Sequence, residues 1–308
     1  MIHPTAAIDK EAILGKNVDI GAYSVIEKEA RLGDGVVISP YVHIRGNTEI
    51  GSNTSISTGA IIGGNAQMLG LKENNGRIRI GENNVIREYV TVNASSSPEK
   101  ETLLGDHNFL MAFSHIAHDC RLGNNIVICN GTLVAGHVEI QDKAFISGNV
   151  VIHQFVRIGR LAMIGGLSRV NQDVPPFMMV VGDSTVWSIN LVGLKRSGFT
   201  NEEILTIKKA FKTLYASKST VKGALDKLKE IDSKYVKEII NFVSDSKRGV
   251  SGPKRSTFIE KLFLDYPYFI WSRIETYGLI KSEVVPAIKI FSINNKKEGG
   301  YGEDLDRG

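Results

Sequence analysis

Aliphatic residues recur at every sixth position along more than half of the chain. Of the 29 positions from residue 2 to residue 170 in steps of six, 26 are isoleucine, leucine or valine. The exceptions are Met68, Asn74 and Pro98. An α-helix repeats every 3.6 residues and would scatter this pattern around its surface, whereas a plain hairpin strand alternates every two residues. The six-residue period therefore fits neither an α-helix nor a plain hairpin strand.

The six-residue unit fits one short strand and one corner. A small or β-branched residue mostly lies four places after each aliphatic residue, and glycine often follows the aliphatic residue directly, as at Gly15, Gly33 and Gly105. We expect the aliphatic side chain to point inward, the small residue to fit the tight turn, and the glycine to supply backbone freedom at the bend. Three such units close one triangular coil, so equivalent positions recur after three repeats. This predicts a parallel β-helix of hexapeptide repeats, with about nine to ten coils, over residues 1–176.

Two stretches interrupt the repeat without shifting its frame. Residues 64–79 and 94–103 are polar and rich in turn-forming residues, so we expect loops that project from the coils. Val174, Pro175 and Pro176 are expected to end the repeat, because paired prolines cannot donate to the next ladder of hydrogen bonds.

The pattern after the prolines becomes helical. Residues 177–198 are expected to be irregular. Thr200 with Glu203 makes a capping box, which predicts the start of a helix. Two further amphipathic helices are predicted over residues 219–231 and 234–246. The fold class is therefore mainly β with an α-helical C-terminal domain.

Residues 177–248 are thus predicted to form a linker and a basic helical domain. Residues 195–255 contain 15 Lys and Arg against 7 Asp and Glu, a balance of +8 in a chain whose net charge is +4. This asymmetry favours an acidic partner, and both nucleic acid and an acidic carrier protein fit. Residues 249–308 are expected to be an extension with a disordered polar tail.

The composition is that of an ordinary globular protein. The chain has 308 residues, of which 42% are hydrophobic and 23% charged, and this length can bury a core. Two cysteines, Cys120 and Cys129, argue for a reducing compartment and against a disulfide framework. The N-terminus has no signal-peptide pattern, and no stretch approaches the ~20 apolar residues of a membrane span. We therefore expect a cytoplasmic protein without an integral membrane segment.

Three histidines fall near one edge of the predicted coil. Positions that are three repeats apart stack directly, at a spacing of about 4.8 Å. Gly136 therefore lies over His118, and His137 lies over Asp119. His153 arrives one coil later at the same edge. We expect these groups to gather within ~10 Å of one another.

This group suits acyl transfer by general-base catalysis. An imidazole can take the proton from a hydroxyl that attacks a thioester. Asp119 can hold the ring of His118 and stabilise the imidazolium, while the backbone N–H of Gly136 approaches a developing oxyanion. No serine or cysteine nucleophile is required. Three histidines could instead bind zinc between subunits, as in a hexapeptide carbonic anhydrase, and this alternative stays open.

Five stretches around and after these residues carry a family resemblance. They are His115-Ile116-Ala117-His118-Asp119-Cys120, Ala135-Gly136-His137-Val138, His153-Gln154-Phe155, Gln172-Asp173-Val174-Pro175-Pro176, and Asn190 with Gly193-Leu194-Lys195-Arg196-Ser197-Gly198-Phe199. In order and spacing they resemble the acyl-[acyl-carrier-protein]–UDP-N-acetylglucosamine O-acyltransferases, the hexapeptide-repeat family that opens lipid A synthesis in Gram-negative bacteria. The resemblance covers residues 1–248.

The resemblance implies a fold and an activity. The β-helix would be left-handed and would associate as a homotrimer with active sites between subunits. The reaction would move a 3-hydroxyacyl group from the phosphopantetheine thioester of acyl carrier protein to the 3-position of UDP-N-acetylglucosamine, a UDP-amino sugar, with no cofactor and no metal. The basic helices would then receive the acidic carrier protein, not nucleic acid.

The resemblance also implies roles for single residues. His118 would be the general base, Asp119 would orient it, and the N–H of Gly136 would serve the oxyanion. The residues implied to bind the substrates are His115, His137, His153, Gln154, Gln67, Asn190 and Arg196, and Lys72 is a candidate to replace a lysine that the family carries two positions earlier. The positions near the acyl pocket, where side-chain bulk limits chain length, are Gly166, Met111 and Met163.

The sequence departs from the family pattern around the acceptor. Met68 and Gly70 stand where the family's first loop commonly carries an aspartate and a lysine. Asn93 and Ala94 replace a His-Arg pair. The residues expected to act on the thioester match the family pattern better than those expected to bind the acceptor sugar. Transfer to a 3-amino nucleotide sugar, which would give an amide, is therefore an alternative, and so is a paralogue that binds the nucleotide sugar without catalysis.

Overall fold

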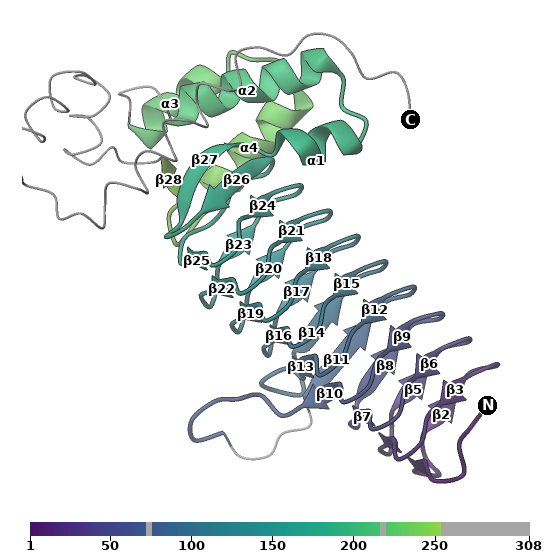
Figure 1. The fold of residues 1–308 in the computed structure, drawn as a ribbon. Coiled ribbons are helices and arrows are strands. Elements are labelled where there is room, and N and C mark those ends of the chain that lie inside the picture. The colour runs from purple at the N-terminus through teal and green to yellow at the C-terminus, as the bar shows by residue number, and fades with distance from the viewer. Residues whose placement is uncertain (72–75, 216–219, 254–308) are drawn as a thin grey trace, which may run out of the picture. The chain divides into compact units, whose positions relative to one another are not determined.

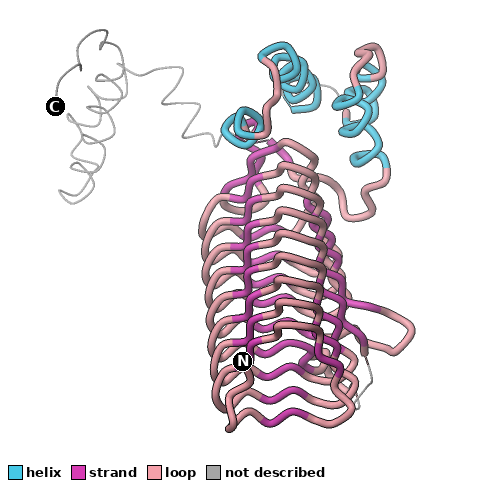
Figure 2. Tube along the Cα trace, turned by 90° about the vertical axis from the view of Figure 1, so that its right-hand side faces the viewer, coloured by secondary structure: helices cyan, strands magenta, loops and turns pink. Residues whose placement is uncertain are grey.

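The computed structural model describes residues 1–71, 76–215 and 220–253. These residues form a three-sided prism with helices at its C-terminal end (Figures 1 and 2). Lys72 and the predicted polar tail lie outside the described residues.

Each side of the prism is a sheet of short strands stacked along its axis. In the described part of the chain, sheet I has nine parallel strands: β1 (Ala7–Ile8), β4 (Val25–Ile26), β7 (His43–Ile44), β10 (Ile61–Gly64), β13 (Thr91–Asn93), β16 (His115–Ile116), β19 (Leu133–Val134), β22 (Val151–Ile152) and β25 (Arg169–Val170). Sheet II has eight parallel strands there: β2 (Ile13–Leu14), β5 (Arg31–Leu32), β8 (Thr48–Ile50), β11 (Arg77–Ile80), β14 (Glu101–Leu104), β17 (Arg121–Leu122), β20 (Glu139–Ile140) and β23 (Arg157–Ile158). Sheet III contains β3 (Asp19–Ile20), β6 (Val37–Ile38), β9 (Ser55–Ile56), β12 (Val85–Ile86), β15 (Phe109–Leu110), β18 (Val127–Ile128), β21 (Phe145–Ile146), β24 (Met163–Ile164), β26 (Met178–Val181), β27 (Thr185–Ile189) and β28 (Gly252–Pro253).

Successive coils pair in the predicted register. His115 pairs with Leu133, three repeats further along the chain. Ile62 pairs with Val92 five repeats later, and Thr91 pairs with His115 four repeats later. Each insertion therefore adds a whole number of repeats, so the frame survives both of them. The prediction of a left-handed hexapeptide β-helix of about nine to ten coils is confirmed.

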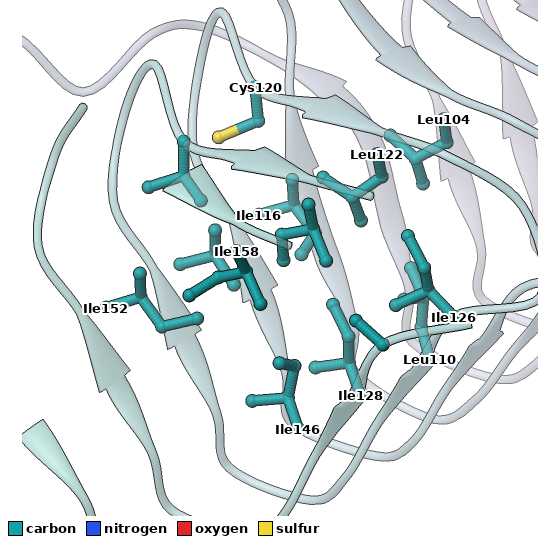
Figure 3. Close-up of a cluster of buried hydrophobic side chains, with 14 of the residues drawn as sticks. Leu104, Leu110, Ile116, Cys120, Leu122, Ile126, Ile128, Ile146, Ile152 and Ile158 are labelled. Carbon is teal, nitrogen blue, oxygen red and sulfur yellow. The ribbon is translucent and has the colours of Figure 1, made fainter. Parts of the chain in front are cut away.

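The aliphatic residues of the repeat fill the interior of the prism (Figure 3). Ile116, Ile128 and Ile146 are fully buried, and so is the small corner residue Thr132. Burying one such aliphatic side chain stabilises the fold by about 1.5–3 kcal/mol. Every coil buries its aliphatic residues in the same way. The six-residue spacing therefore fixes the position of each corner along the axis of the prism.

The glycines that follow the aliphatic residues do not act as predicted. The left-handed backbone conformation at the corners belongs to other residues, such as Asn17, Asp119 and His137, whose φ angles are 57°, 60° and 61°. A Cβ atom on Gly33 would instead lie 2.7 Å from the backbone nitrogen of Ser52 in the next coil. The prediction that these glycines supply freedom at the bend is wrong, since close stacking of the coils is what requires them.

We expect Gly33→Ala to lower the free energy of unfolding by about 1–3 kcal/mol, because the added methyl group forces two coils apart. Gly148→Ala is the matched control, since its Cβ atom would lie 3.4 Å from the nearest atom, the carbonyl oxygen of Asn130. Urea unfolding measures both variants. Equal midpoints for the two would contradict the steric explanation.

Residues 177–198 form ordered elements, so the prediction of an irregular segment is wrong. β26 adds a parallel rung beside β24, and β27 pairs with β26 in the antiparallel direction. The helix α1 (Leu191–Arg196) follows. The prolines end the six-residue pattern, but sheet III continues beyond them.

Three further helices follow: α2 (Asn201–Tyr215), α3 (Val221–Leu228) and α4 (Lys234–Ser244). The predicted capping box is confirmed, because the backbone N–H of Glu203 donates to Thr200 Oγ1 at 3.2 Å and that of Thr200 donates to Glu203 Oε2 at 2.9 Å. Arg160 at the C-terminal end of the prism donates to Glu238 on α4 at 3.0 and 2.7 Å, which ties the helices to the coils. No helix within the described ranges is long and apolar enough to cross a membrane.

The chain returns to the prism after α4. Ser246 Oγ donates to Asp173 Oδ2 at 2.8 Å, and the backbone N–H of Ser251 donates to the carbonyl oxygen of Asp173 at 2.7 Å. β28 then pairs with β27. The predicted start of the extension at residue 249 is therefore too early, because residues 249–253 belong to the body of the fold.

Candidate active site

The residues predicted to be catalytic meet at the edge where each coil passes from sheet I to sheet II, here called the I–II edge. His118 and Asp119 lie in the turn between β16 and β17, and Gly136 and His137 lie in the equivalent turn between β19 and β20. The backbone N–H of His137 donates to the carbonyl oxygen of His118 at 3.0 Å. A Cβ atom on Gly136 would lie 2.6 Å from Cε1 of the His118 ring. The predicted stacking of these residues is confirmed.

His118 and Asp119 form a close and largely buried pair. Nδ1 of His118 lies 2.7 Å from Oδ2 of Asp119, and the two side chains are 11% and 5% exposed. An ionised Asp119 favours the tautomer that carries the proton on Nδ1, which leaves a lone pair on Nε2. His118 can therefore accept a proton at Nε2 while Asp119 fixes its ring.

Polar contacts keep Asp119 ionised. Burial raises the pKa of Asp119, but hydrogen bonds from His118 and Ser96, helped by the nearby His137, bring the pKa below its ordinary value. The backbone N–H of Ser96 donates to Oδ1 at 3.1 Å. The backbone N–H of Asp119 donates to Thr102 Oγ1 at 2.8 Å. A carboxylate held in this way stabilises a positive charge on the adjacent imidazole.

His137 adds a second ring from the next coil. Its Nε2 lies 3.5 Å from Oδ2 of Asp119, and its ring meets that of His118 edge-on, with centroids 5.1 Å apart. The opposite face stacks on Phe155 at 4.5 Å. Burial lowers the pKa of His137, and although Asp119 opposes this, the charges of His118 and Lys100 keep the pKa below its ordinary value. His137 is therefore a neutral hydrogen-bonding group at neutral pH.

His115 occupies the outer face of sheet I beside the pair. Its Nδ1 lies 2.7 Å from Oγ1 of Thr91 on the neighbouring strand β13. Burial, and to a lesser extent the charge of His118, lowers the pKa of His115. It too is a neutral polar group, on the strand that leads to the I–II edge.

His153 and Gln154 are exposed in the next turn of the same edge. Nδ1 of His153 lies 3.2 Å from Nη2 of Arg248. Among the described residues, the set with the spacing of metal ligands is His118, Asp119 and His137, whose ligand atoms lie within 4.8 Å of one another. This set contains an aspartate in place of the third histidine.

The other residues implied to bind substrates lie in three different places. Asn190 caps α1: its Oδ1 accepts from the N–H of Gly193 at 2.9 Å, and its Nδ2 donates to the carbonyl oxygen of Leu161 at 2.9 Å. Both ends of this amide are thus engaged within the fold, and its contact with substrate stays a prediction. Arg196 is exposed in the last turn of α1, and Gln67 is exposed in the loop after β10.

The residues implied to form the acyl pocket are on the other side of the prism. Met111 directly follows β15 and Met163 lies on β24, both in sheet III. Gly166 is exposed at the edge where sheet III passes into sheet I, here called the III–I edge. Within one chain, the structure does not bring these residues to His118.

Cys120 is a packing residue, as expected. It is fully buried, and burial raises the pKa of its thiol to about 12. Cys129 is half-buried, and burial raises its pKa as well. Neither thiol has the depressed pKa of an activated nucleophile.

Sequence reasoning missed Phe155, Thr102 and Ser96. Phe155 follows His137 by three repeats, so the coil length alone would have placed it on that ring. Thr102 and Ser96 lie in the stretch predicted as a loop over residues 94–103, where the six-residue frame gives no neighbours.

Comparison with known families gives two matches. Residues 173–251 match the family described as UDP N-acetylglucosamine O-acyltransferase, domain 2. Residues 29–64 and 101–136 match the bacterial transferase hexapeptide repeat.

Several curated proteins named acyl-[acyl-carrier-protein]–UDP-N-acetylglucosamine O-acyltransferase are similar to this chain. The protein from Herminiimonas arsenicoxydans is 41% identical over 258 residues, which cover 81% of this chain and 98% of the relative. The protein from Aliarcobacter butzleri is 44% identical over 252 residues, which cover 81% and 97%. The matches to the proteins from Gloeothece citriformis and Synechocystis are 45% and 46% identical but span only 62% and 59% of those relatives.

Solved structures of UDP-N-acetylglucosamine acyltransferases have the same fold. The Francisella novicida protein superposes with a TM-score of 0.80 at 35% identity, over 83% of this chain and 95% of that one. The Campylobacter jejuni protein superposes with a TM-score of 0.78 at 38% identity, over 82% and 100%.

Proposed function

The chain belongs to the UDP-N-acetylglucosamine O-acyltransferase family, and on this premise we propose that it transfers an acyl group from acyl carrier protein to the 3-hydroxyl of UDP-N-acetylglucosamine. The observation that carries the proposal is the buried His118–Asp119 pair held against the bare backbone of Gly136. The family resemblance adds a 3-hydroxyacyl donor and the opening step of lipid A synthesis.

The geometry supports a direct transfer. Nε2 of His118 takes the proton of the 3-hydroxyl as its oxygen attacks the thioester carbonyl carbon. The carbon–sulfur bond then breaks, and the imidazolium returns the proton to the departing sulfur. Asp119 stabilises the imidazolium in between. The transfer needs no cofactor, because the donor brings the acyl group as an activated phosphopantetheine thioester.

Gly136 is suited to stabilise the tetrahedral intermediate. Its carbonyl oxygen accepts from the N–H of Phe155 at 3.1 Å, whereas its own N–H donates to none of the described residues. With no Cβ atom in the way, the ring of His118 and the reacting carbonyl can both approach this amide. A single well-placed donor of this kind accelerates acyl transfer by about 10²–10³-fold.

We also propose a homotrimer with each active site between two subunits. The III–I edge carries exposed stacked rings, Tyr23 on Tyr41 at 5.3 Å and Tyr89 on Phe113 at 5.2 Å. Exposed aliphatic residues of sheet I continue this surface: Val25, Ile61, Leu133 and Val151. These exposed rings and aliphatic side chains, interspersed on sheet I with His43, Thr91 and His115, fit contact with a second copy of the chain. A neighbour presenting its III–I edge to the I–II edge would also bring Gly166, with its acyl pocket, to His118.

The helices at the end of the prism supply a surface for acyl carrier protein. On α2 and α3, Lys208, Lys209, Lys222 and Lys227 project from a framework whose buried residues pack against β27 and α4. An acidic carrier is attracted to such a basic face, and the attraction weakens as salt screens it. Because both cysteines are free thiols, which is typical of a reducing compartment, we place the protein in the cytoplasm.

A thioester-consumption assay tests the function. Purified protein is mixed with acyl carrier protein thioesters and with either UDP-N-acetylglucosamine or its 3-amino analogue. We expect turnover with the hydroxyl acceptor, without stoichiometric zinc in the protein. Turnover with the amino analogue alone would make the product an amide. Nucleotide binding without turnover of either acceptor would instead support the non-catalytic paralogue.

A further inference from the structure

Three cations line a cleft that borders the catalytic pair on the side of sheet II. The cleft has a volume of about 540 Å³, and its inner wall includes Asp119 and His137. Arg77 on β11 and Arg121 on β17 project from the outer face of sheet II, and Lys100 lies directly before β14. The strands are rigid parts of the prism, so the backbone of both arginines is held at a fixed position beside the site.

The charge in this cleft is unbalanced. Arg77, Lys100 and Arg121 have no ion-pair partner in the part of the chain that the structure describes. The acid Glu101, which also lines the cleft, lies 3.0 Å from Arg79 outside it. Glu99 also lines the cleft and senses the charge of Lys100, but it is in ion-pair contact with none of the described cations. With Glu101 paired to Arg79, the three cations face two carboxylates, Glu99 and the ionised Asp119. The cleft therefore keeps one surplus positive charge for an incoming ligand.

The insertion between β13 and β14 fixes Lys100 at the cleft. The buried Ser95 accepts from the backbone N–H of Arg77 at 2.8 Å through Oγ, and the same Oγ lies 2.9 Å from the carbonyl oxygen of Lys100. The backbone N–H of the neighbouring Ser96 donates to Asp119 Oδ1 at 3.1 Å. One short loop thus joins the catalytic carboxylate to the cation beside it.

We propose that Arg77, Lys100 and Arg121 form a subsite for a phosphate group of a substrate. The proposal rests on the proposed function, in which both substrates carry phosphate. In UDP-N-acetylglucosamine the diphosphate is bonded to the same sugar ring as the reacting hydroxyl, whereas in the donor the pantetheine arm separates phosphate from thioester. Because the cleft borders Asp119 and His137 directly, the geometry favours the diphosphate. Guanidinium groups bind phosphate oxygens in pairs, and an ammonium adds a point charge.

The test measures binding and turnover separately in the full-length protein. Calorimetry gives the Kd of UDP for Lys100→Met and Arg121→Gln, and steady-state kinetics gives KM for each substrate. Arg31→Gln is the matched control, because Arg31 is exposed on β5 of the same sheet, outside the cleft. We expect each cleft variant to weaken UDP binding about tenfold and to raise KM for the nucleotide sugar with little change in kcat. Glu99→Gln should strengthen UDP binding, whereas Arg31→Gln should leave it unchanged.

The outcomes identify the source of the phosphate. Weaker binding of coenzyme A, which contains the pantetheine phosphate, with UDP binding unchanged, would assign the subsite to the donor. Unchanged Kd values for both probes would overturn the subsite. Because UDP binding needs no turnover, this result is distinct from failure of the proposed function, which would appear as absence of acyl transfer by the wild-type protein.

Discussion

Replacing His118 by alanine is expected to lower kcat for acyl transfer by about 10³-fold, with KM for UDP-N-acetylglucosamine nearly unchanged. The reason is that a neutral sugar hydroxyl is a poor nucleophile until its proton is removed. Nε2 of His118 is the acceptor that the Asp119 contact, at 2.7 Å, leaves unprotonated. Steady-state kinetics with a saturating carrier-protein thioester measures the effect.

His107→Ala is the matched control for this variant. His107 is also a corner histidine, but it lies exposed at the edge between sheets II and III. We expect the control to keep the wild-type rate and both variants to unfold cooperatively, His118→Ala at a lower temperature because the buried Asp119 carboxylate loses its partner. If His118→Ala keeps most of the rate, the base is another group, and His137, whose ring centroid lies 5.1 Å from that of His118, is then the next ring to examine.

The I–II edge could be predicted from the sequence because a solenoid converts sequence separation into distance. The period of six fixes which residues are buried, and three periods fix the residue that lies one rung away. Both His118 over Gly136 and Asp119 over His137 follow from that arithmetic. Each coil must bury its own aliphatic residues, and a shifted pairing between coils would expose them. The register between successive coils is therefore unique.

Sequence separation no longer predicts spatial neighbours where the six-residue period is interrupted. The stretch 94–103 was predicted as a loop, but β14 begins at Glu101, and Thr102 is already a buried strand residue that supports Asp119. The place of Ser96 depends on how the buried Ser95 hydroxyl bonds within the insertion, and no hydrophobic pattern encodes that choice. The contact between Ser96 and the carboxylate of Asp119 was therefore invisible in the sequence.

Two other differences have a similar physical origin. Glycine occurs both where a bend needs a positive φ and where a Cβ atom would clash, and the sequence alone does not separate these reasons. At Gly33 the clash with the next coil is the reason. The hairpin of β26 and β27 was missed because its strands extend a sheet that is already formed, so stacking on β24 overrides their weak local pattern.

Gly136→Ala is expected to lower kcat by about 10²-fold, because a displacement of the base on the order of 1 Å is enough to do so. The added Cβ atom would lie 2.6 Å from Cε1 and 2.7 Å from Nε2 of His118. The imidazole must move away, and Nε2 is the atom that has to reach the sugar hydroxyl. Gly252→Ala is the control for activity, since Gly252 lies on β28 in sheet III, no atom lies within 4 Å of the added Cβ atom, and neither rate nor stability should change.

The same substitution in a His118→Ala background separates two ways in which Gly136 can act. If the methyl group lowers the rate by displacing the ring, the double variant should be no slower than His118→Ala, because no ring remains to be displaced and the two losses are not additive. If the methyl group instead keeps the thioester carbonyl from the backbone N–H of residue 136, the residual rate of His118→Ala should fall by a further factor of about 10²–10³. The residual rate of the double variant therefore decides whether glycine is needed at this corner for the base or for the oxyanion.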